Sequence, residues 1–216
     1  MGRITEEEKQ RLSDSIDAAG LYRITSQEEF EKFIDNSMEG YARNPLFKYV
    51  TGDSFDPSVV REILGFSYSV LAKECIAYAD SSELNAGALW VPSNLSTESI
   101  FDFFKNSAST LKKLGGLSLI LRAVRYESRI VGMKNRLTNQ NDWYLYNYES
   151  CPEYDNDETV IRMLKPVIEY AWTSGRACYM ENSIDTRVTP LMKLGFHIVD
   201  TITIPKTQIK IHGMMV

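Results

Sequence analysis

Hydrophobic and polar positions repeat with two different periods in the second half of the chain. The segment Trp143–Glu149 is rich in aromatic residues and has the composition of a strand. Over about Asn156–Ser174, apolar residues return every three or four positions, which predicts a helix with one buried face. Gly175 then supplies a left-handed cap. A second strand follows at Ala177–Met180, so the pattern is strand, helix, strand.

A strand, a crossover helix and a second strand form a unit whose two strands lie side by side and parallel in one sheet. Ligands commonly bind where such strands end and the helix begins. We therefore expect the functional site at the carboxyl end of the first of these strands.

The rest of the chain predicts further helices and strands around this unit. Capping boxes at Thr5 and Ser26 each open a helix, Pro45 interrupts helical periodicity, and Asp56 begins another helix. The remaining expected elements are strands at Leu21–Thr25, Cys75–Asp80, Ala86–Val91, His197–Ile204 and Gln208–Met215, and helices at Thr97–Leu114 and Ser118–Leu137. We find no linker or repeat, so we expect one domain over residues 1–216, with an N-terminal helical extension at 1–19.

Composition and charge limit the possible partners. The chain has 216 residues, of which 44% are hydrophobic, and a formal net charge of -5. This composition indicates a globular protein with a full core. An acidic chain lacks the excess of cations that non-specific binding to nucleic acid or to an anionic membrane requires. A cationic or amine partner is easier to accommodate.

Cysteine and histidine usage predicts neither disulfides nor a metal site. The three cysteines, Cys75, Cys151 and Cys178, are odd in number and lack framework spacing. Together with an acidic N-terminus and no long apolar run, they favour a soluble protein of the cytoplasm. His197 and His212 have no acidic or cysteine neighbours at ligand spacing, so we expect no metal.

Five segments carry a resemblance to a known family. They are W-Y-L-Y from Trp143, P-E-Y from Pro152, M-L-K-P-V-I-E-Y-A from Met163, C-Y-M-E-N-S from Cys178 and K-L-G-F from Lys193. In order and spacing they are similar to the C-terminal half of the GNAT acetyltransferases, nearest the puromycin N-acetyltransferase-like branch. The resemblance implies an α/β fold: a mixed, mostly antiparallel sheet with helices on both faces and a parallel central strand pair.

The resemblance also implies acetyl-coenzyme A as cofactor. In that family a Gln/Arg-x-x-Gly-x-Gly/Ala turn presents backbone amides at a helix N-terminus, where unpaired N–H groups and the positive dipole end hold the pyrophosphate. The positions that would contact the cofactor here are Tyr148, Ser150, Asn156, Asp157, Glu158, Thr159, Val160 and Arg187.

This chain departs from the signature in the turn itself. Asp155 stands at the Gln/Arg position, and no glycine remains through Val160. Asp155 or Asn156 can cap the helix, and Glu158 can reach back as in a capping box. Each carboxylate facing a pyrophosphate would cost on the order of 1 kcal/mol. The motif is therefore degenerate, and acetyl-coenzyme A is expected to bind weakly or not at all.

The candidate catalytic residues are also altered. Leu191 occupies the position of the family's tyrosine acid, and Arg187 that of an asparagine. Glu149 is the best candidate for the base that frees the attacking amine, although it could equally be a surface carboxylate paired with a basic residue. Glu181 is expected to be structural or positional. Glu127 only interrupts the basic residues of the helix that contains it.

Three aromatic residues are the expected substrate contacts. Phe47 lies in a Pro-Leu-Phe segment that overhangs the acceptor site in the resembling family, and Trp90 lies in a Leu-Trp-x-Pro strand end. Tyr146 is on the central strand. Because the two faces of a strand cannot both contact one ligand, Tyr146 and Tyr148 are expected to divide between pocket and core.

Two hypotheses for function remain open. The chain could transfer an acyl group from acetyl-coenzyme A to a small amine, by direct attack of the positioned amine on the thioester. Alternatively, it could be a catalytically inactive binding or regulatory module that keeps the cleft of the fold but has lost the cofactor.

Overall fold

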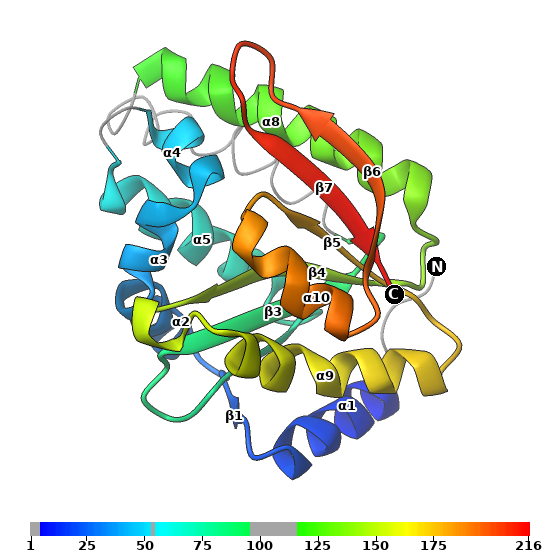
Figure 1. The fold of residues 1–216 in the computed structure, drawn as a ribbon. Coiled ribbons are helices and arrows are strands. Elements are labelled where there is room, and N and C mark those ends of the chain that lie inside the picture. Colours follow the sequence, from blue (N-terminus) through cyan, green and yellow to red (C-terminus); the bar gives the residue numbers. More distant parts are fainter. Residues whose placement is uncertain (1–4, 53–54, 96–115) are drawn as a thin grey trace.

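A seven-stranded mixed sheet forms the centre of the computed structural model, which describes residues 5–52, 55–95 and 116–216 (Figure 1). Its strand order is β1-β2-β3-β4-β5-β7-β6. The strands are β1 Tyr22–Arg23, β2 Ile76–Ala79, β3 Ala86–Pro92, β4 Trp143–Ser150, β5 Cys178–Asn182, β6 His197–Thr203 and β7 Lys210–Met215. Only β4 and β5 are parallel, and every other neighbouring pair is antiparallel. The predicted mixed sheet with a parallel central pair is confirmed.

The central pair separates soon after it forms. Parallel pairing runs from Trp143 opposite Cys178 only as far as Leu145 opposite Met180. At the next residue β4 has a bulge: Trp90 of β3 pairs with Leu145 and Leu89 pairs with Asn147, so Tyr146 is skipped. A bulge bends its strand and increases the local twist. Beyond it β4 follows β3 while β5 follows β7, which opens a gap between β4 and β5.

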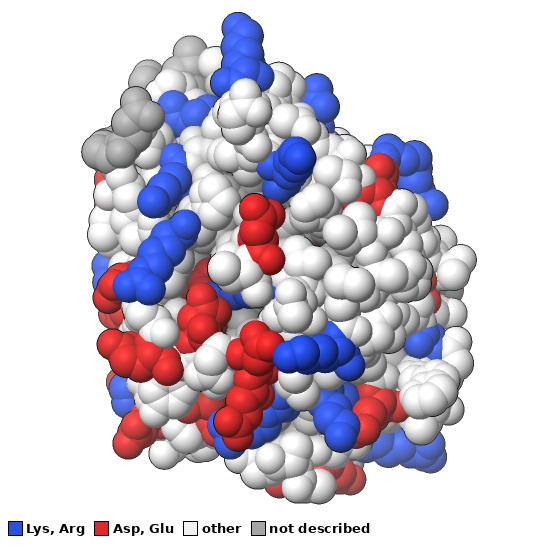
Figure 2. Space-filling model, viewed as in Figure 1, with Lys and Arg blue, Asp and Glu red and all other residues white. Residues whose placement is uncertain are grey.

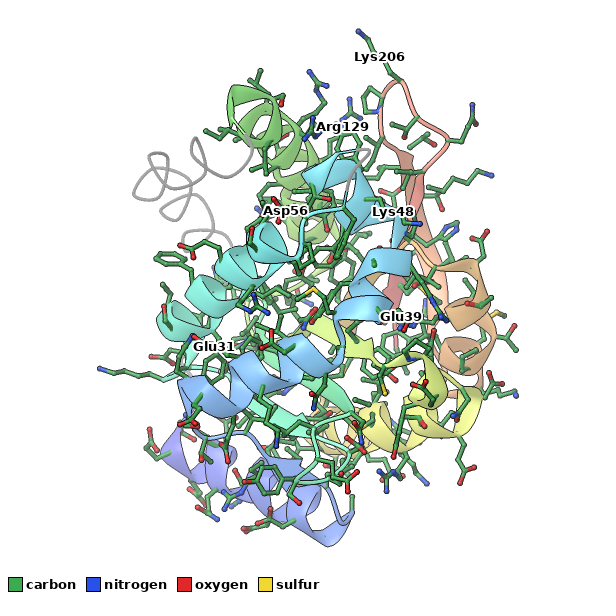
Figure 3. All side chains as sticks on the ribbon, turned by 90° about the vertical axis from the view of Figure 1, so that its left-hand side faces the viewer. Glu31, Glu39, Lys48, Asp56, Arg129 and Lys206 are labelled. Atoms are coloured by element: carbon green, nitrogen blue, oxygen red, sulfur yellow. The ribbon has the colours of Figure 1, made fainter. Side chains whose placement is uncertain are left out.

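Helices cover both faces of the sheet, as predicted. On one face lie α1 Glu6–Ala18, α9 Asp157–Thr173 and α10 Val188–Lys193, and the other carries α2 Gln27–Asn36, α3 Met38–Arg43, α4 Pro45–Thr51, α5 Pro57–Leu71 and α8 Gly116–Leu137. Two short 3-10 turns, η1 Pro152–Tyr154 and η2 Asp185–Arg187, follow β4 and precede α10. Figure 3 shows the second face from outside, with α2 to α5 toward the viewer.

Local signals in the sequence explain most of these boundaries. The capping boxes at Thr5 and Ser26 are both formed, and Gly175 adopts the left-handed φ of +66° that a helix end favours. Pro45 does interrupt a helix, but it also starts the next one, because proline is well suited to a first helical turn. The segment after Pro45 is therefore helix α4. The helix expected at Thr97–Leu114 lies outside the described residues.

Charge is mixed over the face shown in Figure 2, where blue and red side chains lie next to one another on the left and below, and uncharged surface extends to the right. Within the described ranges, no helix combines the length and the apolar character needed to cross a bilayer.

Candidate functional site

A cavity of about 160 Å³ lies where β4 and β5 separate. Its wall includes Tyr144 and Tyr146, which pack with the helices α2, α3 and α5, and also Leu145 and Tyr148, which pack with α9. Residues from both faces of one strand can line it only because the cavity passes through the gap in the sheet. The expected division of Tyr146 and Tyr148 between pocket and core is therefore wrong, and the bulge at Tyr146 is the reason.

Two carboxylates face the cavity at the end near α8, which we call the α8 end. Glu127 comes from α8 and Glu181 from β5. The hydroxyl of Tyr144 donates a hydrogen bond to Oε2 of Glu181 at 2.6 Å. Oε1 of Glu181 is buried and makes no hydrogen bond of good geometry among the described residues, although the hydroxyl of Tyr179 also acts on this carboxylate and lowers its pKa. Glu181 thus has hydrogen-bonding capacity available to a ligand.

Burial changes the protonation of both carboxylates. It raises the pKa of Glu181 to about 7, against the lowering effect of the Tyr144 hydroxyl. Burial, reinforced by the negative charge of Glu181, raises the pKa of Glu127 to about 8. Near neutral pH this pair of acids holds at least one proton and can exchange it.

Lys134 lies beside this pair, and its charge acts on both carboxylates. Its Nζ donates to the backbone carbonyl of Ser93 at 2.6 Å and lies 5.0 Å from the centre of the Tyr144 ring. Burial lowers the pKa of Lys134 to about 8, and the charges of Glu181 and Glu127 oppose that shift. A small recess beside the main cavity is lined by Lys134, Glu127 and Glu181 together. Two acids thus share one lysine there.

The opposite end of the cavity, which we call the α9 end, is dominated by Arg187. Arg187 is 6% exposed, and its guanidinium is paired with Glu149 and with Asp155, the latter at 3.1 Å between Nε and Oδ1. Another of its N–H groups donates to the carbonyl of Tyr148 at 3.4 Å, and the guanidinium lies 5.0 Å from the centre of that ring. Burial would lower the pKa of Arg187, but the Glu149 carboxylate holds it above its ordinary value.

Glu149, the candidate base, is fully buried and does not line the cavity. It is paired with Arg187, as in the alternative drawn from the sequence, but in the interior and not at the surface. Gly40 of α3 packs directly on this strand end, since a Cβ there would lie 2.2 Å from the carbonyl oxygen of Ser150. The contact leaves no room for a ligand on that side.

The N-terminus of α9 is capped by the chain's own side chain. Oδ1 of Asn156 accepts a hydrogen bond from the amide of Thr159 at 3.0 Å, as predicted. Asp157 pairs with Lys193 of α10 at 2.7 Å. The capping box expected for Glu158 is wrong, because α9 begins at Asp157 and Glu158 is therefore its second residue, whereas the box requires the third.

These contacts show whether the α9 end fits a coenzyme A diphosphate. The Thr159 amide already has an acceptor, the Tyr148 carbonyl is engaged by Arg187, and Asp157 and Glu158 place negative charge in the first turn. An anion gains at a helix N-terminus only where amides are unpaired and the local charge is favourable. In this arrangement the residues do not fit the cofactor, and we derive no chemical step through it.

The structure brings together some of the predicted site residues and separates others. Phe47, Tyr146, Tyr148, Val160 and Arg187 line the cavity, whereas Glu149, Ser150 and the positions from Asn156 to Thr159 do not.

Trp90 is fully buried away from the cavity lining. Its Nε1 donates to the hydroxyl of Tyr78 at 3.0 Å, and that hydroxyl donates to the Met163 carbonyl at 2.7 Å. Trp90 thus makes core contacts in place of the expected substrate contact.

Sequence reasoning missed the two carboxylates of the α8 end. Glu181 was expected to be positional, and Glu127 was noted only as an acid among arginines. That interruption was the available signal, because an acidic residue facing inward from a basic amphipathic helix needs a reason to be there. Tyr126 of α8 also lines this cavity, and nothing in the sequence marked it as a site residue.

Comparison with known proteins identifies the fold. No protein-family model and no curated protein matches the chain. Among solved structures it is similar to a histone acetyltransferase HPA2 and related acetyltransferase from Corynebacterium glutamicum, with 17% identity, coverage of 90% of this chain and 94% of that one, and a TM-score of 0.60. An arylalkylamine N-acetyltransferase 2 from Aedes aegypti gives 13% identity, coverage of 91% of this chain and 98% of that one, and a TM-score of 0.57. A polyamine N-acetyltransferase from Drosophila melanogaster gives 10% identity, coverage of 91% of this chain and 98% of that one, and a TM-score of 0.56. At these identities the likeness establishes the GNAT acetyltransferase fold.

Proposed function

We propose that this chain, which has the GNAT acetyltransferase fold, binds a small amine in the cavity between β4 and β5. One observation carries the proposal: Glu127 and Glu181, two carboxylates with raised pKa values, face a cavity whose other walls are largely aromatic and aliphatic. Buried acids of this kind are stabilised by a cation that enters between them. A protonated amine is such a cation.

The size and lining of the cavity indicate the size and chemical character of the group that carries the amine. A cavity of about 150 Å³ lined by apolar side chains is large enough to hold benzene, and this cavity measures about 160 Å³. Phe47, Tyr126 and Tyr146 contribute aromatic surface, which favours an aromatic ring or a bound cation. The proposed ligand is a single ring, or an aliphatic group of that size, that bears an aminoalkyl chain.

The position of the carboxylates suggests how the amine is held. Its ammonium group would donate to Oε1 of Glu181, and Glu127 supplies further negative charge once it is ionised. Because the pKa of Glu181 is about 7, this carboxylate is also suited to accept a proton from the ammonium and release the neutral amine. Glu181 replaces Glu149 as the candidate base.

Acyl transfer to that amine is a second candidate function. It is favoured by the passage through the sheet, which gives the α8 end and the α9 end access to one another. The names of the arylalkylamine and polyamine N-acetyltransferases among the similar structures also support an amine acceptor. The resemblance to the puromycin N-acetyltransferase-like branch points in the same direction. Transfer from acetyl-coenzyme A would require Arg187 to leave its present partners.

Binding of two matched ligands tests the proposal. Calorimetry at pH 7.5 with phenethylamine should give measurable affinity, whereas phenethyl alcohol, which has the same ring and no charge, should bind at least tenfold more weakly. Equal affinity for the two ligands, or no binding of the amine at millimolar concentration, would contradict it. Incubation with acetyl-coenzyme A and phenethylamine, with product detected by mass, decides the second candidate separately.

A further inference from the structure

Arg187 occupies the part of the β4–β5 gap where the resemblance places the backbone contacts of a cofactor. It reaches the carbonyl of Tyr148 from η2, and it is held there by Glu149 at the end of β4 and Asp155 in the following turn. These three partners come from the strand end and the turn that would otherwise form the cofactor site. One side chain therefore contacts both the strand end and the turn.

The two residues that pair with Arg187, Glu149 and Asp155, are both acidic. Glu149 is fully buried, and a buried carboxylate is costly unless a cation is paired with it. Asp155 stands where the resembling family has Gln or Arg. Because Arg187 pairs with both Glu149 and Asp155, the three side chains support one another without a ligand.

We infer that Arg187, with Glu149 and Asp155, is an internal plug that closes the α9 end of the cavity and takes the place of coenzyme A. The cavity then has one end available to a ligand, whose amine meets Glu127 and Glu181. Closure follows from an arginine that is 6% exposed and fills the gap between the separating strands.

An alternative role for Arg187 is to bind an incoming anion such as the cofactor diphosphate. Its guanidinium already pairs with two carboxylates and donates to a carbonyl. An anion would have to displace Asp155 and would then lie beside the Glu149 carboxylate. Like charges in a buried site are unfavourable, so the geometry supports closure over anion binding.

Removal of the plug should expose unused hydrogen-bonding groups. Oε2 of Glu149 is buried and has no hydrogen-bond partner within the described ranges, and the buried hydroxyls of Ser150 and Tyr148 have at most one another as partners. Ser150, Tyr148 and the released Tyr148 carbonyl would remain when Glu149 and Arg187 are both truncated. They could then bind the amide groups of pantetheine, the uncharged part of coenzyme A next to the thiol.

The test compares the wild-type chain with the double variant Glu149→Ala, Arg187→Ala. Truncating both partners avoids leaving one buried charge alone. The matched control is Arg136→Ala, Asp200→Ala, which removes an ion pair on the surface. Binding of pantetheine and of coenzyme A is measured by calorimetry up to millimolar concentration, and folding by circular dichroism.

The plug predicts no binding of either probe by the wild type or by the control, and at least a tenfold gain in affinity for pantetheine in the double variant. Coenzyme A should gain less than pantetheine, because the α9 cap and its acids remain. Micromolar binding of either probe by the wild type would overturn the inference. So would a folded double variant that binds pantetheine no better than the wild type.

If the alanine variant does not fold, Glu149→Gln with Arg187→Ala removes both charges, keeps the volume of residue 149, opens the space of the arginine and is judged by the same two results. Phenethylamine binding by the wild type is recorded in parallel. It tests the proposed function and does not depend on the state of the α9 end, so the two ideas can fail separately.

Discussion

The two ends of the cavity use the same residue types in opposite ways. At the α8 end, Glu127 and Glu181 lie beside Lys134, and burial raises the pKa of both carboxyl groups toward neutrality. At the α9 end, Glu149 and Asp155 are both paired directly with Arg187. Carboxylates that face the cavity can serve a ligand, whereas a carboxylate that lies outside the cavity lining and is buried against an arginine serves the fold.

The largest expected effect is on stability at the α9 end. Arg187→Ala leaves Glu149 buried without a cation, which should lower the free energy of unfolding by about 3–5 kcal/mol. Arg136→Ala removes an exposed partner of Asp200 and should change it by less than about 1 kcal/mol. Urea unfolding of the three proteins measures both differences. If the two variants were equally stable, the α9 end would not be a buried charge cluster.

The next largest effect is expected on amine binding at the α8 end. Glu181→Gln keeps the shape of the side chain but removes its charge, so it should weaken phenethylamine binding about 10- to 100-fold, which corresponds to a charged hydrogen bond of about 1.5–3 kcal/mol. Glu127→Gln should cost less at pH 7, because the pKa of Glu127 is about 8 and the residue is then largely protonated.

Glu39→Gln, on the outer side of α3 where Glu39 pairs with Arg43 (Figure 3), is the matched control and should leave the affinity unchanged. An equal loss in all three variants would mean that the amine responds only to net charge.

A pH series separates the two ends by protonation. The raised pKa values mean that the folded state binds more protons than the unfolded state between the ordinary value of 4.5 and about 7 to 8. Stability from these groups is therefore present below pH 4.5 and is lost as pH rises through that window. The variant Glu127→Gln, Glu181→Gln should lose less stability than the wild type between pH 5 and 8, by several kcal/mol, because each unit of raised pKa corresponds to about 1.4 kcal/mol.

Thermal unfolding across that range measures the slopes. Identical slopes for wild type and double variant would show that the two carboxylates titrate as they do in the unfolded chain.

The smallest effect concerns the cap of α9. Asn156→Ala removes the acceptor for the Thr159 amide, and the loss of such a cap costs about 1 kcal/mol. Lys193→Ala, which breaks an exposed pair with Asp157, should cost less than about 0.5 kcal/mol. Chemical denaturation of both variants shows whether the Asn156 side chain or the surface charge stabilises this helix end.

Much of the fold could be predicted from the sequence because its determinants are local. Periodicity located α9 and its two flanking strands, and a crossover of that kind requires parallel neighbours. Capping residues at Thr5, Ser26 and Asn156 marked helix starts within one residue.

The site was less predictable because its determinants are not local. Arg187 and Glu149 are 38 residues apart in the sequence and meet only in the folded chain. The sequence therefore offered a basic partner for Glu149 as one alternative, but it indicated neither which residue that partner is nor that the pair is buried. The bulge at Tyr146 has no signal in the sequence, yet it opens the cavity and places both Tyr146 and Tyr148 on its wall. Trp90 was assigned to the site from a strand resemblance that does not specify which face points to the cavity.

The central claim is that the cavity is open to an amine at the α8 end and closed at the α9 end by Arg187. A crystal structure of the wild-type chain grown with both phenethylamine and coenzyme A tests it most directly. Such a crystal should show density for the amine, with its nitrogen beside Glu181, and Arg187 still paired with Glu149. A coenzyme A molecule with its diphosphate on the first amides of α9, and Arg187 turned away, would contradict it.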